Sequence, residues 1–242
     1  MATYIEADNL SKRFTLRHNR SLKELALAAV RRRPLSDTFL ALDSVSFEVQ
    51  EGETVALLGF NGSGKSTLLK LISGVLLPDG GRVRTRGRVA GLIEVGAGFH
   101  PDLTGRENVY LNGAILGMPE SQIKAAFDDI VGFAEAEVER FIDTEVKFYS
   151  SGMFLRLAFS VAVHSDPDVF LVDEILAVGD EPFQRKCLER IHHLKEEGRT
   201  LVIVSHDLDL VAELCERGIL LRAGKQAGDG TAEEMVAALR AS

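Results

Sequence analysis

The stretch Gly59-Phe60-Asn61-Gly62-Ser63-Gly64-Lys65-Ser66-Thr67 decides the fold, because it joins an apolar run to a helical pattern. Its spacing is G-x-x-x-x-G-K-[ST]; the run at 55–58 before it is typical of a buried strand, and residues 66–72 after it have helical spacing. In such a loop the glycines let backbone N–H groups converge on phosphate oxygens at a helix N-terminus. We therefore predict a nucleotide phosphate site, in which Lys65 neutralises the β and γ phosphates and the Ser66 hydroxyl reaches Mg²⁺.

Apolar, β-rich runs recur along the chain, with helical patterns between several of them, at residues 45–49, 89–95, 169–172 and 201–204. The last two are nearly continuous apolar stretches, as expected for parallel strands that are buried on both faces. Between about residues 104 and 164 only helical patterns occur, including residues 120–133 and a segment that starts at Ser151. The sequence thus predicts an α/β sheet protein with an inserted helical subdomain.

Chemically active side chains stand where two of the predicted strands stop. Asp173 and Glu174 come directly after the run at 169–172, and Ser205-His206-Asp207 follows the run at 201–204. Ligands of open α/β sheets bind at the C-terminal tips of the strands. We expect Asp173 to orient Mg²⁺ and its waters, Glu174 to polarise an attacking water and His206 to contact the γ-phosphate. Alone, a strand-end acid is an ordinary strand end and a lone histidine is more often structural, so these roles depend on the phosphate loop.

A further motif, Tyr149-Ser150-Ser151-Gly152-Met153, stands just before a helical pattern. It is similar to the Leu-Ser-Gly-Gly-Gln signature, with Ser151 in place of a glycine and Met153 in place of the glutamine. With the phosphate loop, the acids at 173 and 174, Asp180 and the histidine at 206, it makes nearly the whole chain resemble an ATP-binding-cassette (ABC) ATPase. Asp180 matches the D-loop aspartate of that family, although residues 175 and 176 depart from its usual Pro-Thr.

The resemblance implies the P-loop NTPase fold of an ABC-type nucleotide-binding domain, with an inserted helical subdomain and an antiparallel β portion. It also implies a homodimer that sandwiches two ATP molecules, each held by the phosphate loop of one chain and by Ser150, Ser151 and Gly152 of the other. A hydroxyl and backbone donors at a helix N-terminus suit the γ-phosphate, where charge builds during transfer. Hydrolysis should therefore depend on dimerisation, although a Ser-Ser-Gly turn by itself would be an ordinary helix cap.

Longer strings of sequence point to one subfamily. Residues 91–108, 148–153 and 176–180 look like those of ABC ATPases that export polysaccharides such as O-antigen, capsule and teichoic acid. One family residue is missing, since the glutamine that normally follows the strand near Val95 is absent. Glu94 is the nearest candidate for its contact with Mg²⁺ or water, but a carboxylate cannot donate a hydrogen bond as an amide can.

The N-terminal part of the chain raises two alternatives. Phe14 is our choice for the residue that stacks on adenine, with Phe39 as the alternative and a plain core role open for either. Between them, residues 15–38 form an insert in which Ser21 and Glu24 have capping-box spacing and Arg31-Arg32-Arg33 ends a predicted helix. This basic helix either lies at the membrane beside a permease or packs on its own sheet with a solvated basic end.

Composition excludes several other classes of protein. The chain has 242 residues and a formal charge of −8, with +4 in the first 40 residues and −12 in the rest. An acidic body disfavours nucleic-acid binding, because phosphate contacts need a concentrated basic face. No apolar run is long enough to cross a bilayer, the N-terminus lacks the regions of a secretory signal, and two cysteines, Cys187 and Cys215, form no close pair. These features favour a reducing cytoplasmic setting.

We therefore expect one ABC ATPase domain over residues 1–242, with residues 1–103 and 165–242 as core and β subdomain, and residues 104–164 as the helical subdomain. The expected function is ATP hydrolysis that powers polysaccharide export through a separate transmembrane permease, at the cytoplasmic face of the membrane. An importer ATPase or a lipid exporter is the nearest alternative. A soluble cassette protein acting on ribosomes or DNA, and a small-molecule P-loop kinase, are more distant ones.

Overall fold

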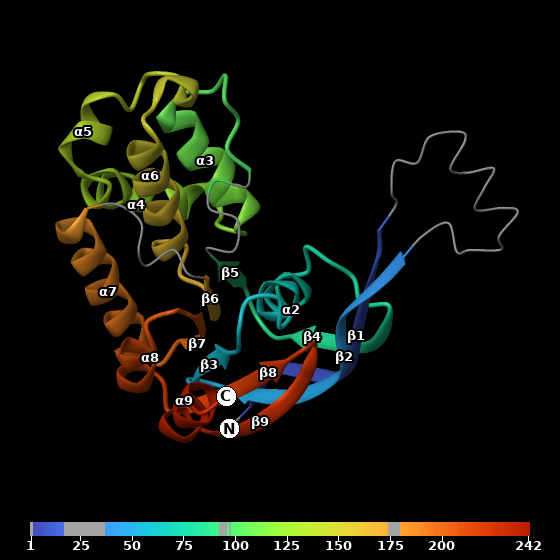
Figure 1. Cartoon of the computed structure of the whole chain (residues 1–242). Coiled ribbons are helices and arrows are strands. Elements are labelled where there is room, and N and C mark those ends of the chain that lie inside the picture. Colours follow the sequence, from blue (N-terminus) through green and yellow to red (C-terminus); the bar gives the residue numbers. More distant parts are fainter. Residues whose placement is uncertain (1, 17–36, 92–95, 97, 174–179) are drawn as a thin grey trace, which may run out of the picture.

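A central sheet of six strands has the order β5-β6-β7-β3-β8-β9 (Figure 1). The structure is a computed structural model, and it describes residues 2–16, 37–91, 96, 98–173 and 180–242. The first five strands run parallel, and β9 joins β8 antiparallel. The bounds are β3 Thr54–Leu58, β5 Val89–Gly91, β6 Val169–Asp173, β7 Thr200–Val204, β8 Arg217–Arg222 and β9 Lys225–Thr231.

The inner strands β3, β6 and β7 are buried on both faces, as the apolar runs predict. In β6, Phe170 and Val172 pack on one side of the sheet, whereas Val169 and Leu171 pack on the other. The first side is covered by the C-terminal end of α6 and by α7 (Glu181–Glu196), α8 (Leu208–Leu214) and α9 (Ala232–Arg240). The second is covered by α2 (Lys65–Ile72) and a second sheet. Because side chains alternate along a strand, one strand supplies both cores.

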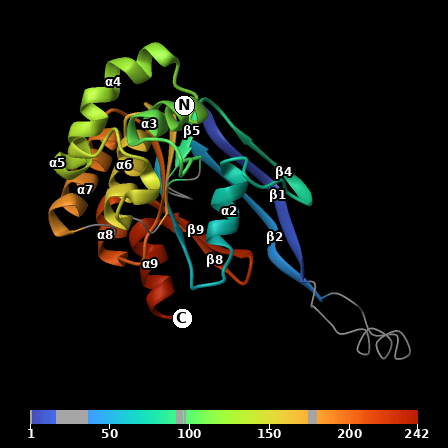
Figure 2. The same ribbon diagram turned by 90° about the horizontal axis from the view of Figure 1, so that it is seen from above.

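The second sheet is antiparallel and has the order β2-β1-β4, with bounds β1 Thr3–Leu16, β2 Asp37–Gln50 and β4 Gly80–Thr85. Val45, Phe47 and Val49 point into the core while the residues between them are exposed, which is the period-two pattern of a half-buried strand. Figure 2 shows this sheet on the side opposite to α7 and α8. The α/β fold class, with its antiparallel β portion, is thus confirmed.

Four helices gather at one end of the molecule: α3 (Gly105–Ile115), α4 (Glu120–Phe133), α5 (Glu135–Arg140) and α6 (Ser151–Val163), with a short 3-10 turn at Val146–Phe148. They share an apolar core of their own, built around Val109, Ile130 and Leu157. Thr104 starts α3 with a capping box to Glu107. The predicted helix at 120–133 has the bounds of α4. The division of the chain into residues 1–103 with 165–242, and 104–164, stays a prediction.

The helical insert predicted at residues 15–38 needs correction at both ends. Residues 15 and 16 belong to β1 and residues 37 and 38 to β2, where Thr15 pairs with Thr38. The β-branched side chains of Thr15 and Thr38, next to the aromatic pair Phe14 and Phe39, favour a pleated pair over a helix. The rest of the insert, with Ser21 and the three arginines, lies outside the described residues, as do Glu94 and Glu174. Within the described ranges, no helix is both long and apolar enough to cross a membrane.

Both cysteine thiols are buried in the core beside α7 and α8. Burial raises the pKa of Cys187 and of Cys215 to about 12 each, because the apolar surroundings disfavour the thiolate. At pH 8 the folded protein should therefore react with a thiol reagent such as DTNB far more slowly than free cysteine, whereas both thiols should react at once in guanidinium chloride. Rapid reaction of either thiol in the native protein would contradict this burial.

Candidate nucleotide site

The phosphate loop, residues 59–67, connects the end of β3 to the start of α2. Its backbone takes conformations that only glycine adopts readily, with φ 146° at Gly59 and 108° at Gly64. A Cβ on Gly59 would collide with the carbonyl oxygen of Leu221, and one on Gly64 would lie 2.7 Å from the carbonyl oxygen of Ala41. Close packing against the neighbouring strands β2 and β8 therefore fixes the loop in place.

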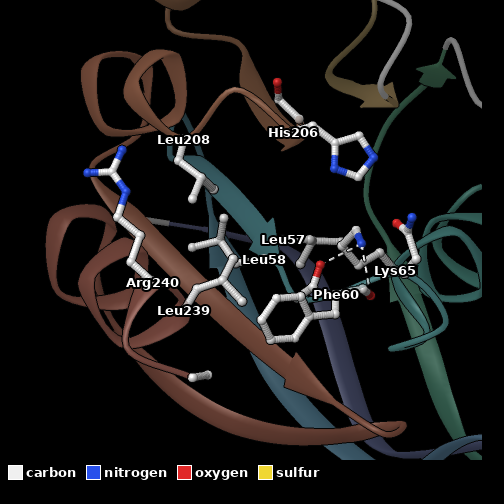
Figure 3. Close-up of a pocket in the computed structure, with 12 residues that line it drawn as sticks. Leu57, Leu58, Phe60, Lys65, His206, Leu208, Leu239 and Arg240 are labelled. Carbon is white, nitrogen blue, oxygen red and sulfur yellow. Dashed lines mark hydrogen bonds between the residues drawn. The ribbon is translucent and has the colours of Figure 1, made fainter.

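Two polar groups inside the loop determine its chemistry. Lys65 is only 6% exposed, and its Nζ donates to the carbonyl oxygens of Gly59 at 2.7 Å and Phe60 at 3.3 Å (Figure 3). The Oγ of Ser63 is buried and has no hydrogen-bond partner among the described residues. A buried hydroxyl without a partner costs free energy, so this oxygen suits an additional polar ligand at the loop.

A hollow of about 420 Å³ lies against the loop. The residues around it come from the loop and from two other segments: Phe39, Ala41, Asn61, Gly62, Ser63, Gly64, Lys65, Ser66, Thr67 and His206. The structure therefore brings the loop and His206 together, as the sequence predicts. Phe39, which is 49% exposed, also lines this hollow.

Phe14, the first choice for adenine stacking, is not among the described residues that line the hollow. It lies directly opposite Phe39 on the neighbouring strand and is half-buried. In an antiparallel pair the two opposite side chains share a face, so the register of β1 and β2 puts one aromatic residue at the hollow and its partner beside it. The geometry favours the alternative, Phe39.

A second hollow of about 690 Å³ lies behind the loop, between β3, α8 and the end of α9. Figure 3 shows Lys65 and His206 on one side of it and Arg240 on the other, with apolar side chains between them, namely Leu57, Leu58, Phe60, Leu208 and Leu239. Arg240 is paired with Asp209 at 2.7 Å. His206 lines both hollows, so its imidazole stands between the phosphate side of the loop and the apolar space behind it.

Asp173 and His206, which the sequence predicts at the nucleotide, lie at or just after the ends of two parallel strands. Asp173 is the last residue of β6 and is in register with Val204, the last residue of β7. His206 follows two residues later, and β3, which precedes the phosphate loop, is the other neighbour of β7. The carboxyl ends of parallel strands meet at one edge of a sheet, so these groups share that edge.

The signature segment, residues 149–153, begins α6. Ser150 is exposed at the N-cap, where its Oγ accepts a hydrogen bond from the N–H of Met153 at 3.2 Å, and Ser151 and Gly152 form the first turn. Burial raises the pKa of the Tyr149 hydroxyl to about 12, and this hydroxyl donates to the carbonyl oxygen of Phe141 at 2.9 Å. Among the described residues that line the two hollows, none belongs to the signature segment.

Asp180 caps α7, and its Oδ1 accepts from the N–H of Phe183 at 3.3 Å. Arg156 of α6 approaches the same oxygen, with its Nη2 at 3.0 Å. Arg156 belongs to none of the motifs from which the site is predicted, although it is the only charged residue in the 13 residues of α6.

Comparisons with known proteins identify the family. The sequence profile described as ABC transporter matches residues 42–177. The chain is 51% identical over 187 residues to the ABC transporter protein AbcA of Aeromonas salmonicida, an alignment that covers 77% of this chain and 60% of AbcA. It is 40% identical over 240 residues to the O-antigen export system ATP-binding protein RfbB of Klebsiella pneumoniae, covering 98% of this chain and 97% of RfbB.

A solved structure has the same fold. The dimeric ATP-binding cassette MJ0796, in a post-hydrolysis state bound to ADP and Pi, superposes with a TM-score of 0.73 at 24% identity, covering 94% of this chain and 98% of that one. The fold, the order of the motifs and the two relatives agree with the resemblance found in the sequence. The chain belongs to the ABC transporter family.

Proposed function

We propose that this chain is the ATP-hydrolysing subunit of a polysaccharide exporter, acting as a homodimer on a separate transmembrane permease at the cytoplasmic face of the membrane. One observation carries the proposal: the phosphate loop and His206 meet at one hollow, while the exposed N-terminus of α6 is not part of its lining. A second copy of the chain would supply that missing half. ATP would then lie between the loop of one copy and Ser150, Ser151 and Gly152 of the other.

The described residues fit Mg²⁺ bound together with a nucleotide. They contain no cluster of three or more His, Cys, Asp or Glu side chains that could hold a metal ion without a nucleotide. Mg²⁺ beside a nucleotide needs only one or two protein ligands, since phosphate oxygens and waters complete its shell. The Ser66 hydroxyl in the first turn of α2 and the carboxylate of Asp173 at the end of β6 are suited to that part. When bound, the ion neutralises charge on the β and γ phosphates.

Each side chain then has one task in hydrolysis. Lys65 holds the β and γ phosphates, and His206 contacts the γ-phosphate. Glu174 accepts a proton from the attacking water, whose oxygen forms a bond to the γ-phosphorus as the bond to the bridging oxygen of ADP breaks. The N-terminus of α6 in the second copy stabilises the charge that builds on the γ-phosphate. Asp180 would border the site at the start of α7.

Export of a glycan is supported by the relative with nearly the same length. RfbB carries O-antigen export in its name, and the alignment covers 97% of it. In this proposal the transport path belongs to a separate permease, as the resemblance to ABC ATPases that export polysaccharides implies. ATP binding would close the dimer and hydrolysis would reopen it. Residues 94–108 and the helical subdomain would pass this motion to the permease.

Glu174→Gln should leave ATP binding intact and lower kcat at least about 100-fold, because an amide cannot take the proton of the attacking water. Phosphate release and the affinity for a fluorescent ATP analogue measure the two effects. Glu189→Gln is the matched control, since that carboxylate is exposed on α7 and should not affect turnover. Hydrolysis by the Glu174 variant at the wild-type rate would exclude the assignment.

Phe39→Ala should weaken ATP binding about tenfold, the loss expected when one aromatic platform for a base is removed. Phe14→Ala should change the affinity by less than about twofold, because its ring is outside the lining of the hollow. Isothermal titration with ATP measures both, and Lys65→Ala provides a reference with the phosphate contact removed. A larger loss for Phe14→Ala would make Phe14 the stacking residue.

Deletion of the gene in its host should remove a glycan from the cell surface and leave its lipid-linked form inside the cell, since the permease would lack its energy source. Gels and immunoblots of surface glycans measure this. The wild-type gene should restore the glycan, whereas Glu174→Gln should not. An unchanged surface glycan, with loss of solute uptake or of lipid transport instead, would favour the importer or the lipid exporter.

A further inference from the structure

Arg156 stands at a junction of three helices. Its side chain is 14% exposed, and its Nη1 and Nη2 reach Glu135 Oε2 at 2.7 Å and Asp180 Oδ1 at 3.0 Å. Glu135 is the first residue of α5, Arg156 lies in α6, and Asp180 is the N-cap of α7. One guanidinium therefore joins the first turn of α5 and the start of α7 to the signature helix.

A cluster of three phenylalanine rings packs next to the guanidinium and connects α4, α6 and α7. The rings of Phe133, Phe159 and Phe183 come from α4, α6 and α7, with centroids 5.9 Å apart in each pair. The guanidinium carbon of Arg156 lies 5.4 Å from the centre of the Phe183 ring. Because an unpaired charge is costly in a largely buried place, the two carboxylates are needed to keep Arg156 over these rings.

The backbone at Glu135 is in a conformation that non-glycine residues rarely take, with φ 76°. A non-glycine residue held in this conformation carries backbone strain, which the contacts around it must offset. The Glu135 carboxylate accepts a hydrogen bond from Arg156 Nη1 at 2.7 Å. Lys186 of α7 also contacts the end of α4, where its Nζ donates to the carbonyl oxygen of Phe133 at 2.9 Å.

We propose that Arg156 is a positioning residue, which sets the signature helix and its N-cap Ser150 against Asp180 at the start of α7. It does not touch the nucleotide in this arrangement. Ser150 and Arg156 are six residues apart on one rigid helix, so fixing Arg156 fixes the direction in which Ser150 is presented. The inference rests on the proposed function, in which Ser150 serves the ATP held by the second copy.

The pairing with Asp180 also links the four-helix group, α3 to α6, to the central sheet. Glu135 and α6 belong to that group, while α7 packs against the sheet through Phe183 and Ile191. Movement of α6 relative to the start of α7 would have to break or redirect the bond between Arg156 and Asp180. Loss of this bond should therefore slow turnover without removing the phosphate loop's hold on ATP.

The full-length Arg156→Met variant tests the proposal. Its kcat should fall about tenfold, the effect of about 1.4 kcal/mol on the barrier, while its KM and its affinity for a fluorescent ATP analogue stay within about twofold of wild type. Arg156→Lys should recover part of kcat, since one ammonium keeps the charge but not the fork between two carboxylates. Glu135→Gln, which keeps a hydrogen-bond acceptor, should lower kcat by about threefold and tests the junction even if Arg156→Met fails to fold.

Arg217→Met is the matched control. Arg217 also lies between two carboxylates, with its Nη1 3.0 Å from Glu53 Oε1 and its Nε 2.6 Å from Asp229 Oδ1, but it belongs to β8 and not to the signature helix. Its kcat should stay within about twofold of wild type. The proposal is overturned if Arg217→Met loses as much kcat as Arg156→Met, or if Glu135→Gln and Arg156→Lys both turn over like wild type. A wild-type chain without ATPase activity would instead refute the proposed function itself.

Discussion

Burial of the central strands on both faces is the constraint on which the rest of the molecule depends. In β3, β6 and β7, alternate side chains enter two separate cores, one under α7 to α9 and the other under α2 and the antiparallel sheet. Strands buried in this way have their backbone groups satisfied only by neighbouring strands, so their number and direction are fixed. Their carboxyl ends are thereby held at one edge, where the phosphate loop, Asp173 and His206 emerge.

The phosphate loop and the Ser150 end of α6, the two halves of the proposed site, are held in place in different ways. The phosphate loop is held by close backbone packing at Gly59 and Gly64, whereas Ser150 is presented at the exposed end of a helix whose far end packs into the central core. A loop fixed by packing suits tight binding of phosphates, and an exposed helix end suits a contact that forms and breaks. The ion pairs of Arg156 lie where the helix that carries Ser150 meets the first turn of α5 and the start of α7.

Local patterns in the sequence predict much of this arrangement, and contacts between distant residues account for what they miss. The phosphate loop, the two-faced strands, the helix at 120–133 and the cap at Ser150 each depend on neighbours along the chain, so spacing and residue type are sufficient. The choice between Phe14 and Phe39 depends instead on the register between β1 and β2, which spacing does not give. The pairing of Arg156 with Asp180 likewise joins residues from separate helices.

The division of each central strand between two cores also limits how the protein can change in length during evolution. One residue inserted into β6 would send Phe170 to the side of Leu171 and would turn Asp173 to the opposite face, so that packing and chemistry would be lost in a single event. An insertion in a surface connection costs far less, since closing a longer loop changes the entropy only slowly. Differences in length between this chain and its relatives should therefore accumulate in connections and at the ends, while the strands that carry the site keep their length.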